Sequence, residues 1–152
     1  MTQPRAAPPD GPATSPGFRM WLVMLAWQRA IKAVLRPLEI THVQFVLLAG
    51  TWWLSSRDGP PTQAQLASHS HTDPMMTSQV LRRLEDKQLV ERFADTIDAR
   101  AKRVRLTSSG QALLARALPA VEAADADFFA PVSRPELLRM LTRLADDDED
   151  HR

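Results

Sequence analysis

The side chains best suited to chemistry in this sequence are cationic, and they gather in one short polar segment. Positions 98 to 105 hold one acid and four bases, a net charge of +3 (four minus one), whereas the whole chain has a net charge of +1. The bases are Arg100, Lys102, Arg103 and Arg105. Such cations can bind phosphate groups, and arginine can also enter the minor groove of duplex DNA. The local charge therefore predicts contact with nucleic acid.

A second candidate surface lies upstream, on a predicted helix. Asp73 stands at an N-cap position and Pro74 at the first helical position, so a helix should begin here and run to about position 87. Polar side chains on its outward face can hydrogen-bond base edges in the major groove. The residues expected to do so are Thr77, Ser78, Gln79 and Arg82. The spacing of Thr77 to the apolar residues that follow also permits an inward position.

Other chemistries find less support in the sequence. His69 and His71 lie beside Asp73, and two imidazoles with a carboxylate can bind a metal ion. The segment is also a polar break between helices, in which Asp73 already has a capping role, so we predict no metal and no cofactor. Cysteine is absent, which excludes disulfides and thiolate nucleophiles. Ser108 has no base partner visible in the sequence, so we predict no enzyme activity.

The elements that position these side chains follow from hydrophobic periodicity. Capping boxes begin helices at Thr41 and Thr62, and the helix capped by Asp73 follows. The apolar period then changes to two at 90–93 and 103–106, which predicts a hairpin. This order is typical of a winged helix-turn-helix. The expected fold is therefore mainly α with a small β-hairpin wing, and residues 41–106 form the DNA-binding lobe.

Long helices flank this lobe and predict a second copy of the chain. The segment 18–35 is apolar on nearly all sides, so it must be buried on several sides, which a small domain cannot supply alone. The helices predicted within 107–146 end in a leucine-rich stripe. We therefore expect residues 18–35 and 107–146 to form a dimerisation lobe, and the chain to be a homodimer.

The two ends of the chain differ in composition from the region 18–146. Residues 1–17 contain five of the twelve prolines, which predicts a disordered tail. Residues 147–152 form an acidic tail, and this run of acids should fray any helix that enters it. The apolar run 20–27 is far shorter than the ~20 residues of a membrane span. We expect no membrane association and a cytoplasmic location.

These residues resemble the MarR (multiple antibiotic resistance regulator) family of winged helix-turn-helix transcription factors. The resemblance rests on the helix at 38–48, on the segment 84–92 that leads into the hairpin, and on a DxRxxR pattern that starts at Asp98 and is followed by LTxxG at 106–110. It covers about 18–144. Gln88 departs from the glycine usual at that helix end and should cost roughly 1 kcal/mol if its backbone is left-handed.

The resemblance implies a ligand-responsive repressor that binds a pseudo-palindromic DNA operator as a homodimer. Asp98 would orient neighbouring arginines while Arg100 reaches the DNA. A small anionic aromatic effector is also implied, for which His42 could meet the anion and Trp27 and Trp52 the ring. The alternative is a winged-helix module that binds a protein and has lost DNA binding.

Overall fold

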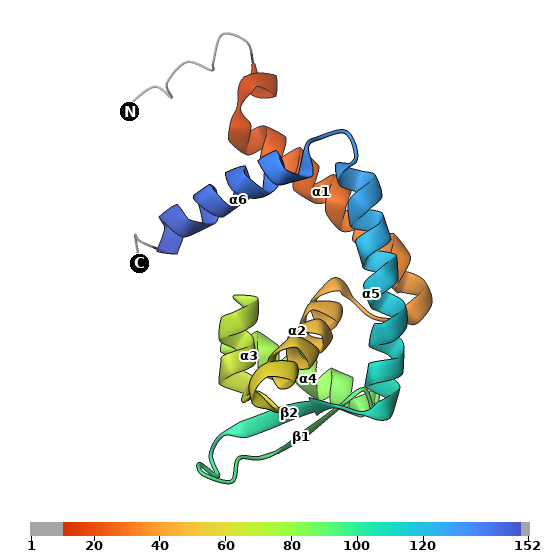
Figure 1. Ribbon diagram of the computed structural model, residues 1–152, viewed down its shortest axis with the longest axis vertical. Coiled ribbons are helices and arrows are strands. Elements are labelled where there is room, and N and C mark those ends of the chain that lie inside the picture. The colour runs from red at the N-terminus through yellow and green to blue at the C-terminus, as the bar shows by residue number, and fades with distance from the viewer. Residues whose placement is uncertain (1–10, 150–152) are drawn as a thin grey trace, which may run out of the picture.

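A computed structural model describes residues 11–149 of the chain. The elements follow in this order: a 3-10 turn (Pro12–Thr14), α1 (Pro16–Leu35), a second 3-10 turn (Arg36–Leu38), α2 (His42–Asp58), α3 (Gln63–Ser70), α4 (Pro74–Asp86), β1 (Val90–Ala94), β2 (Lys102–Leu106), α5 (Ser108–Phe129) and α6 (Arg134–Glu149). This arrangement (Figure 1) confirms the expected fold, mainly α with one antiparallel hairpin.

Local capping explains where the central helices begin. In both capping boxes the threonine hydroxyl accepts from the backbone N–H of the glutamine, and the glutamine side-chain oxygen accepts from the backbone N–H of the threonine. These two distances are 3.2 and 3.1 Å for Thr41 with Gln44, and 3.1 and 2.9 Å for Thr62 with Gln65. Asp73 caps α4 by accepting from the backbone N–H of Met76 at 2.9 Å. The three helix starts of the DNA-binding lobe are therefore confirmed.

The hairpin is attached to the rest of the lobe at two points. Its register pairs Val90 with Leu106 and Ala94 with Lys102. Midway along β2, the N–H of Val104 donates to the Pro61 carbonyl at 2.9 Å, which ties β2 to the loop before α3. At the base, the N–H of Thr107 donates to the Leu89 carbonyl at 3.1 Å. The wing is therefore an extension of the helical lobe rather than a free arm.

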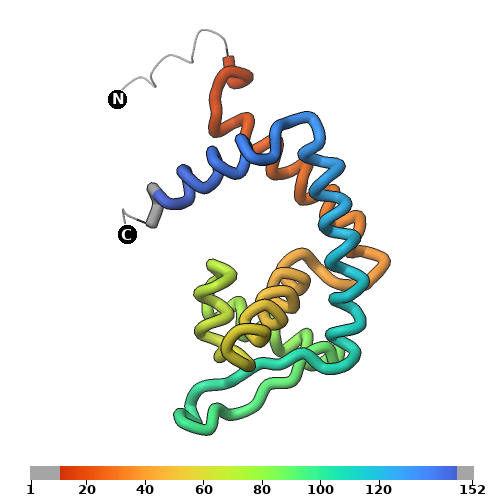
Figure 2. The backbone as a smooth tube through the Cα atoms, viewed as in Figure 1, coloured from red at the N-terminus to blue at the C-terminus, as the bar shows by residue number. Residues whose placement is uncertain are grey.

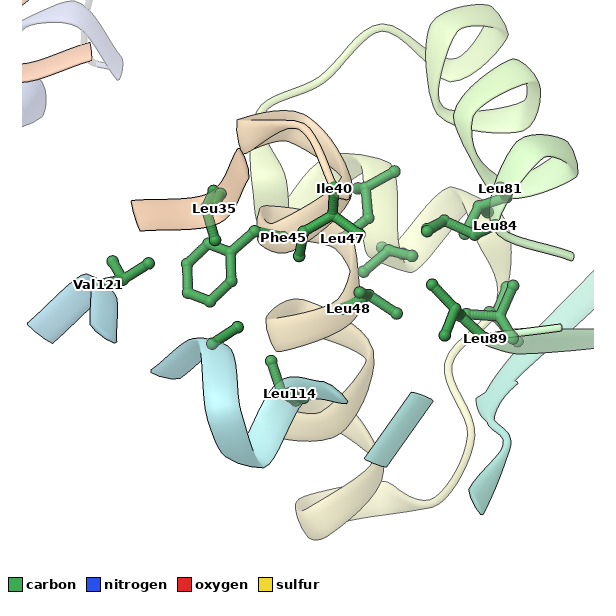
Figure 3. Close-up of a cluster of buried hydrophobic side chains, with 14 of the residues drawn as sticks. Leu35, Ile40, Phe45, Leu47, Leu48, Leu81, Leu84, Leu89, Leu114 and Val121 are labelled. Carbon is green, nitrogen blue, oxygen red and sulfur yellow. The ribbon is translucent and has the colours of Figure 1, made fainter. Parts of the chain in front are cut away.

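One apolar cluster joins the helices and the hairpin (Figure 3). Leu47 and Leu48 of α2 and Leu81 and Leu84 of α4 are completely buried in it. Burying one such side chain stabilises a fold by about 1.5–3 kcal/mol. Further members come from the end of α1, the hairpin and α5: Ile31, Leu35, Val90, Val104, Leu114 and Val121. The recognition elements therefore share their core with the start of α5.

The chain bends into an open arc in which α5 links two unequal ends (Figure 2). One end holds α2, α3, α4 and the hairpin, and the other holds the first half of α1 together with α6 (Figure 1). In α6 none of the described side chains is buried. The exposed large apolar side chains of these two helices are Phe18, Met20, Trp21, Leu22, Val23, Met24, Leu138, Met140, Leu141 and Leu144.

The ends of the chain differ from the sequence prediction. Residues 1–10 and 150–152 lie outside the described residues, but the expected disorder of 11–17 is wrong. Ser15 accepts from the backbone N–H of Phe18 at 3.3 Å and Pro16 follows at the first helical position, the same signature as at Asp73 and Pro74. At the other end, α6 enters the acidic run and continues to Glu149, and the fraying expected there stays a prediction.

The structure also bears on the helix end at Gln88 and on membrane association. Gln88 adopts the left-handed conformation (φ +59°), the strained choice that the sequence left open. Among the described residues, no helix is both long enough and apolar enough to cross a membrane.

Candidate nucleic-acid interface

The outward face of α4 presents polar side chains at helical spacing. Gln79 and Arg82 are exposed and Ser78 is half-buried. Because these positions are separated by one, three and four residues, they lie along one side of the helix. All three can donate hydrogen bonds to base edges, and arginine can bind guanine with two bonds. The geometry fits the major-groove role predicted for them.

Thr77 does not belong to this face, and the predicted base contact is wrong. Its side chain is completely buried. Its hydroxyl donates to the Asp73 carbonyl at 2.8 Å and lies 2.7 Å from the hydroxyl of Thr72, which supplies the proton of that second bond. Thr77 therefore fixes the first turn of α4 to the preceding loop, the inward position that its spacing permitted.

Arg103 is partly exposed, and hydrogen bonds hold its guanidinium against the lobe. Its Nε donates to Asp95 Oδ1 at 2.6 Å, and its Nη1 donates to the Pro60 carbonyl. The hydrogen bond from Arg103 lowers the pKa of the Asp95 carboxyl below its usual range. Arg103 therefore braces the wing against the loop that follows α2, and its contact with DNA stays a prediction.

Asp98 orients the wing differently from the role that the resemblance implied. Its Oδ1 accepts from the backbone N–H of Arg100 at 3.0 Å. Asp98 therefore shapes the backbone of the loop at Arg100 and does not orient an arginine guanidinium. The arginine-orienting role falls to Asp95, which the sequence analysis missed. The hairpin register could have revealed this role. Phe93 pairs with Arg103, so Asp95, two residues after Phe93, lies at the same end of the wing as Arg103.

A second brace joins the wing to α4 and α3. Arg92 of β1 donates through Nε to Glu85 Oε2 at 3.2 Å and through Nη1 to Gln63 Oε1 at 3.1 Å. The hydrogen bond from Arg92 lowers the pKa of the Glu85 carboxyl. This network was also missed, because Gln63 is 29 residues from Arg92 and because Glu85 and Arg92 meet only across the turn between α4 and β1.

The free cations of the wing lie beside the starts of two helices. Arg100 and Lys102 are exposed and line a hollow of about 290 Å³ together with Gln63 and Pro74. The starts of α3 and α4 are already capped by Thr62 and Asp73, so the positive charge beside them comes from the wing. Arg100 and Lys102 therefore place two cations next to the outward face of α4.

The three candidate effector residues occupy two separate places. Trp27 and His42 meet edge to face, with ring centroids 5.1 Å apart, and the Trp27 indole donates to Asp125 Oδ1 at 2.7 Å. Burial lowers the pKa of His42, and the nearby Asp125 opposes this shift in part. These contacts join α1, α2 and α5. The expected single pocket with Trp52 is therefore wrong.

Trp52 instead lines a hollow of about 450 Å³ between α2, α3 and α5. Trp53, Phe45 and Ser70 also line it. The Ser70 hydroxyl oxygen is buried and has no hydrogen-bond partner. A buried hydroxyl without a partner costs free energy, so Ser70, like His69, is a polar side chain that a ligand in this otherwise apolar hollow can meet.

The histidines that suggested a metal are dispersed. His69 lines the Trp52 hollow, His71 ends α3 with a left-handed backbone, and Asp73 caps α4. Within residues 11–149, no group of three or more side chains is arranged to hold a metal ion.

A capped recognition helix beside a braced basic hairpin defines a winged helix-turn-helix protein. More particularly, the chain belongs to the MarR family, whose model matches residues 40–102, and it is a transcriptional regulator. It is 41% identical over 127 residues to the uncharacterized HTH-type transcriptional regulator YdcH of Bacillus subtilis, covering 84% of this chain and 86% of the relative.

Two other proteins extend this similarity. The chain is 34% identical to the HTH-type transcriptional repressor Rv2887 of Mycobacterium tuberculosis, covering 86% of this chain and 94% of the relative. It also superposes on the crystal structure of the M. tuberculosis regulator MosR in complex with DNA, with a TM-score of 0.76 and 26% identity over 91% of this chain and 98% of that one.

Proposed function

We propose that this protein is a homodimeric, ligand-responsive repressor that binds a pseudo-palindromic DNA operator. The observation that carries the proposal is the surface on which Gln79 and Arg82 of α4 stand beside the free wing cations Arg100 and Lys102. The polar face would read bases while the cations bind phosphates or the minor groove. The repressor name of one relative and the DNA in the MosR structure support the same reading.

The unpaired apolar helices support the homodimer. The first half of α1 and the stripe on α6 leave large apolar side chains in water, at a cost that burial against a partner removes. A second copy supplies such a partner and a second recognition helix. Two-fold symmetry then requires two half-sites, about 34 Å apart centre to centre if they face one side of the duplex.

Selection of bound duplexes from a random DNA pool tests the operator, and sedimentation at micromolar concentration tests the dimer. We expect a palindromic consensus and about twice the chain mass of 17.0 kDa. A pool from which no duplex is retained at low salt would contradict DNA binding and favour the protein-binding module instead. A monomer would contradict the two half-sites.

The effector is proposed to bind in the hollow at Trp52. Trp52 and Trp53 offer flat apolar walls, the Ser70 hydroxyl offers one hydrogen bond, and the Arg57 guanidinium lies 4.6 Å from the Trp53 ring centroid. A small aromatic anion matches these groups: its ring can stack on the indoles and its charge can meet Arg57. Trp27 and His42 join the lobes, and His42 also lines a second hollow with Lys32 and Arg36, so its role in meeting an anion stays a prediction.

Titration with salicylate, followed by tryptophan fluorescence, tests this site. We expect quenching that saturates, a weaker midpoint in Ser70→Ala, and an unchanged midpoint in the control variant Ser109→Ala at the start of α5. Operator DNA should weaken salicylate binding by the same factor by which salicylate weakens operator binding. An identical midpoint with and without operator would show a binding site that does not control DNA binding.

A further inference from the structure

Met75 is the most exposed large apolar side chain of α4. It is 72% exposed, whereas Met76, the next residue, is 39% exposed. Single exposed apolar residues are common on protein surfaces, so the position of Met75 matters more than its exposure. It precedes Ser78, Gln79 and Arg82 by three, four and seven residues, and these spacings place all four on one face of the helix.

The first turn of α4 is firmly placed at the wing side of the interface. Asp73 caps it, Thr77 anchors it to the preceding loop, and Pro74 lines the hollow that contains Arg100 and Lys102. Recognition helices contact base edges mainly with their N-terminal residues. Met75 therefore stands where the helix comes closest to the bases, at the head of the polar face.

Only one apolar group lies on the base edges of the major groove, the C5-methyl of thymine. Methionine is unbranched and polarizable, so it adapts to such a methyl at low cost. We propose that Met75 contacts a thymine methyl in each operator half-site and so determines base preference there. This inference rests on the proposed DNA-binding function.

Replacement of thymine by uracil isolates this contact, because uracil lacks the methyl and keeps the hydrogen-bonding groups. In a duplex selected from the random pool, each thymine position is changed to uracil in both half-sites, and affinity is measured for each duplex. From the usual free energy of burying one CH₂ or methyl, wild-type protein should lose about fourfold in affinity per half-site at one position, or about fifteenfold for both half-sites.

Variants assign the effect to the side chain. Met75→Ala should bind the thymine and uracil duplexes within about twofold of each other, and Met75→Leu should keep most of the discrimination because it stays apolar. Ile97→Ala is the matched control. Ile97 is 92% exposed in the wing loop, so the control removes a similarly exposed apolar group without touching α4, and it should discriminate as wild type does.

The outcomes separate this inference from the function on which it rests. Equal binding of every thymine and uracil duplex by wild-type protein would overturn the role of Met75 and leave operator binding intact. Discrimination that persists in Met75→Ala would assign the contact to another residue and overturn it as well. If no duplex is selected, the proposed function fails and the inference fails with it.

Discussion

The DNA-binding lobe and the dimerisation helices use apolar residues in opposite ways. In the lobe, Leu47, Leu48 and Leu84 are completely buried within the chain. In α6, Leu138, Leu141 and Leu144 repeat at helical spacing just as regularly, but all three are exposed. The same sequence pattern therefore has two meanings, a core closed by this chain and a core that requires a second copy.

Double substitution of Leu141 and Leu144 by aspartate should have the largest effect, dissociation of the dimer. If the stripe is the dimer interface, each copy loses two buried leucines, at about 1.5–3 kcal/mol per side chain, and the dimer dissociation constant should rise about ten-thousandfold or more. Sedimentation should then give 17.0 kDa. Thr142→Asp adds a charge beside the stripe and should remain dimeric. A double variant that is still dimeric would place the interface elsewhere.

Gly110→Ala should show how tightly the lobe is closed. A Cβ at this position would lie 2.0 Å from the Leu89 carbonyl oxygen, so the start of α5 must move away from the turn before β1. Overpacking of this kind costs about 3 kcal/mol. Urea unfolding measures the change. In the control Gly17→Ala, the nearest atom is the Ser15 Oγ at 3.9 Å, so a comparable loss there would refute this explanation.

The two wing arginines should differ in what they support. Arg100→Ala should keep stability and reduce the slope of log affinity against log salt by about 0.9 per lost phosphate contact. Arg103→Ala should lower stability, because it removes the donor to Asp95 Oδ1 and to the Pro60 carbonyl. Arg116→Ala removes an exposed cation from α5 as a control. Equal salt slopes in all three variants would refute the assignment.

At the junction between the two regions, we expect a smaller effect, that of pH on stability. Because the pKa of folded His42 is below its ordinary value of 6.5, the unfolded chain binds more protons just below that pH, and stability should fall as the pH drops through 6.5. In His42→Gln, the free energy of unfolding measured with urea should change less as the pH drops through 6.5. The lowered pKa values of Glu85 and Asp95 act separately, since their stabilisation is lost only below about 4.5 and 3.8. A pH profile unchanged in His42→Gln would contradict this.

Sequence reasoning succeeded at most sites where the cause was local, although it missed the local cap at Ser15 and Pro16, and it failed where the cause was distant. The capping boxes at Thr41 and Thr62 involve residues three apart, so they could be read directly from the chain. The pairs of Arg103 with Asp95 and Arg92 with Gln63 depend on hairpin register and on how the wing meets α3, which the sequence analysis did not use. Trp52 was grouped with His42 because residue type alone does not say which hollow a side chain enters.

The two braces of the wing constrain how this protein can respond to a signal. Arg92 fastens β1 to α4 and α3, and Arg103 fastens β2 to the loop after α2. We therefore expect the wing and the recognition helix to move together, because bending the wing alone would break both braces. We expect a ligand to act instead on the separation of the two DNA-binding lobes in a dimer, through the junction where Trp27, His42 and Asp125 meet.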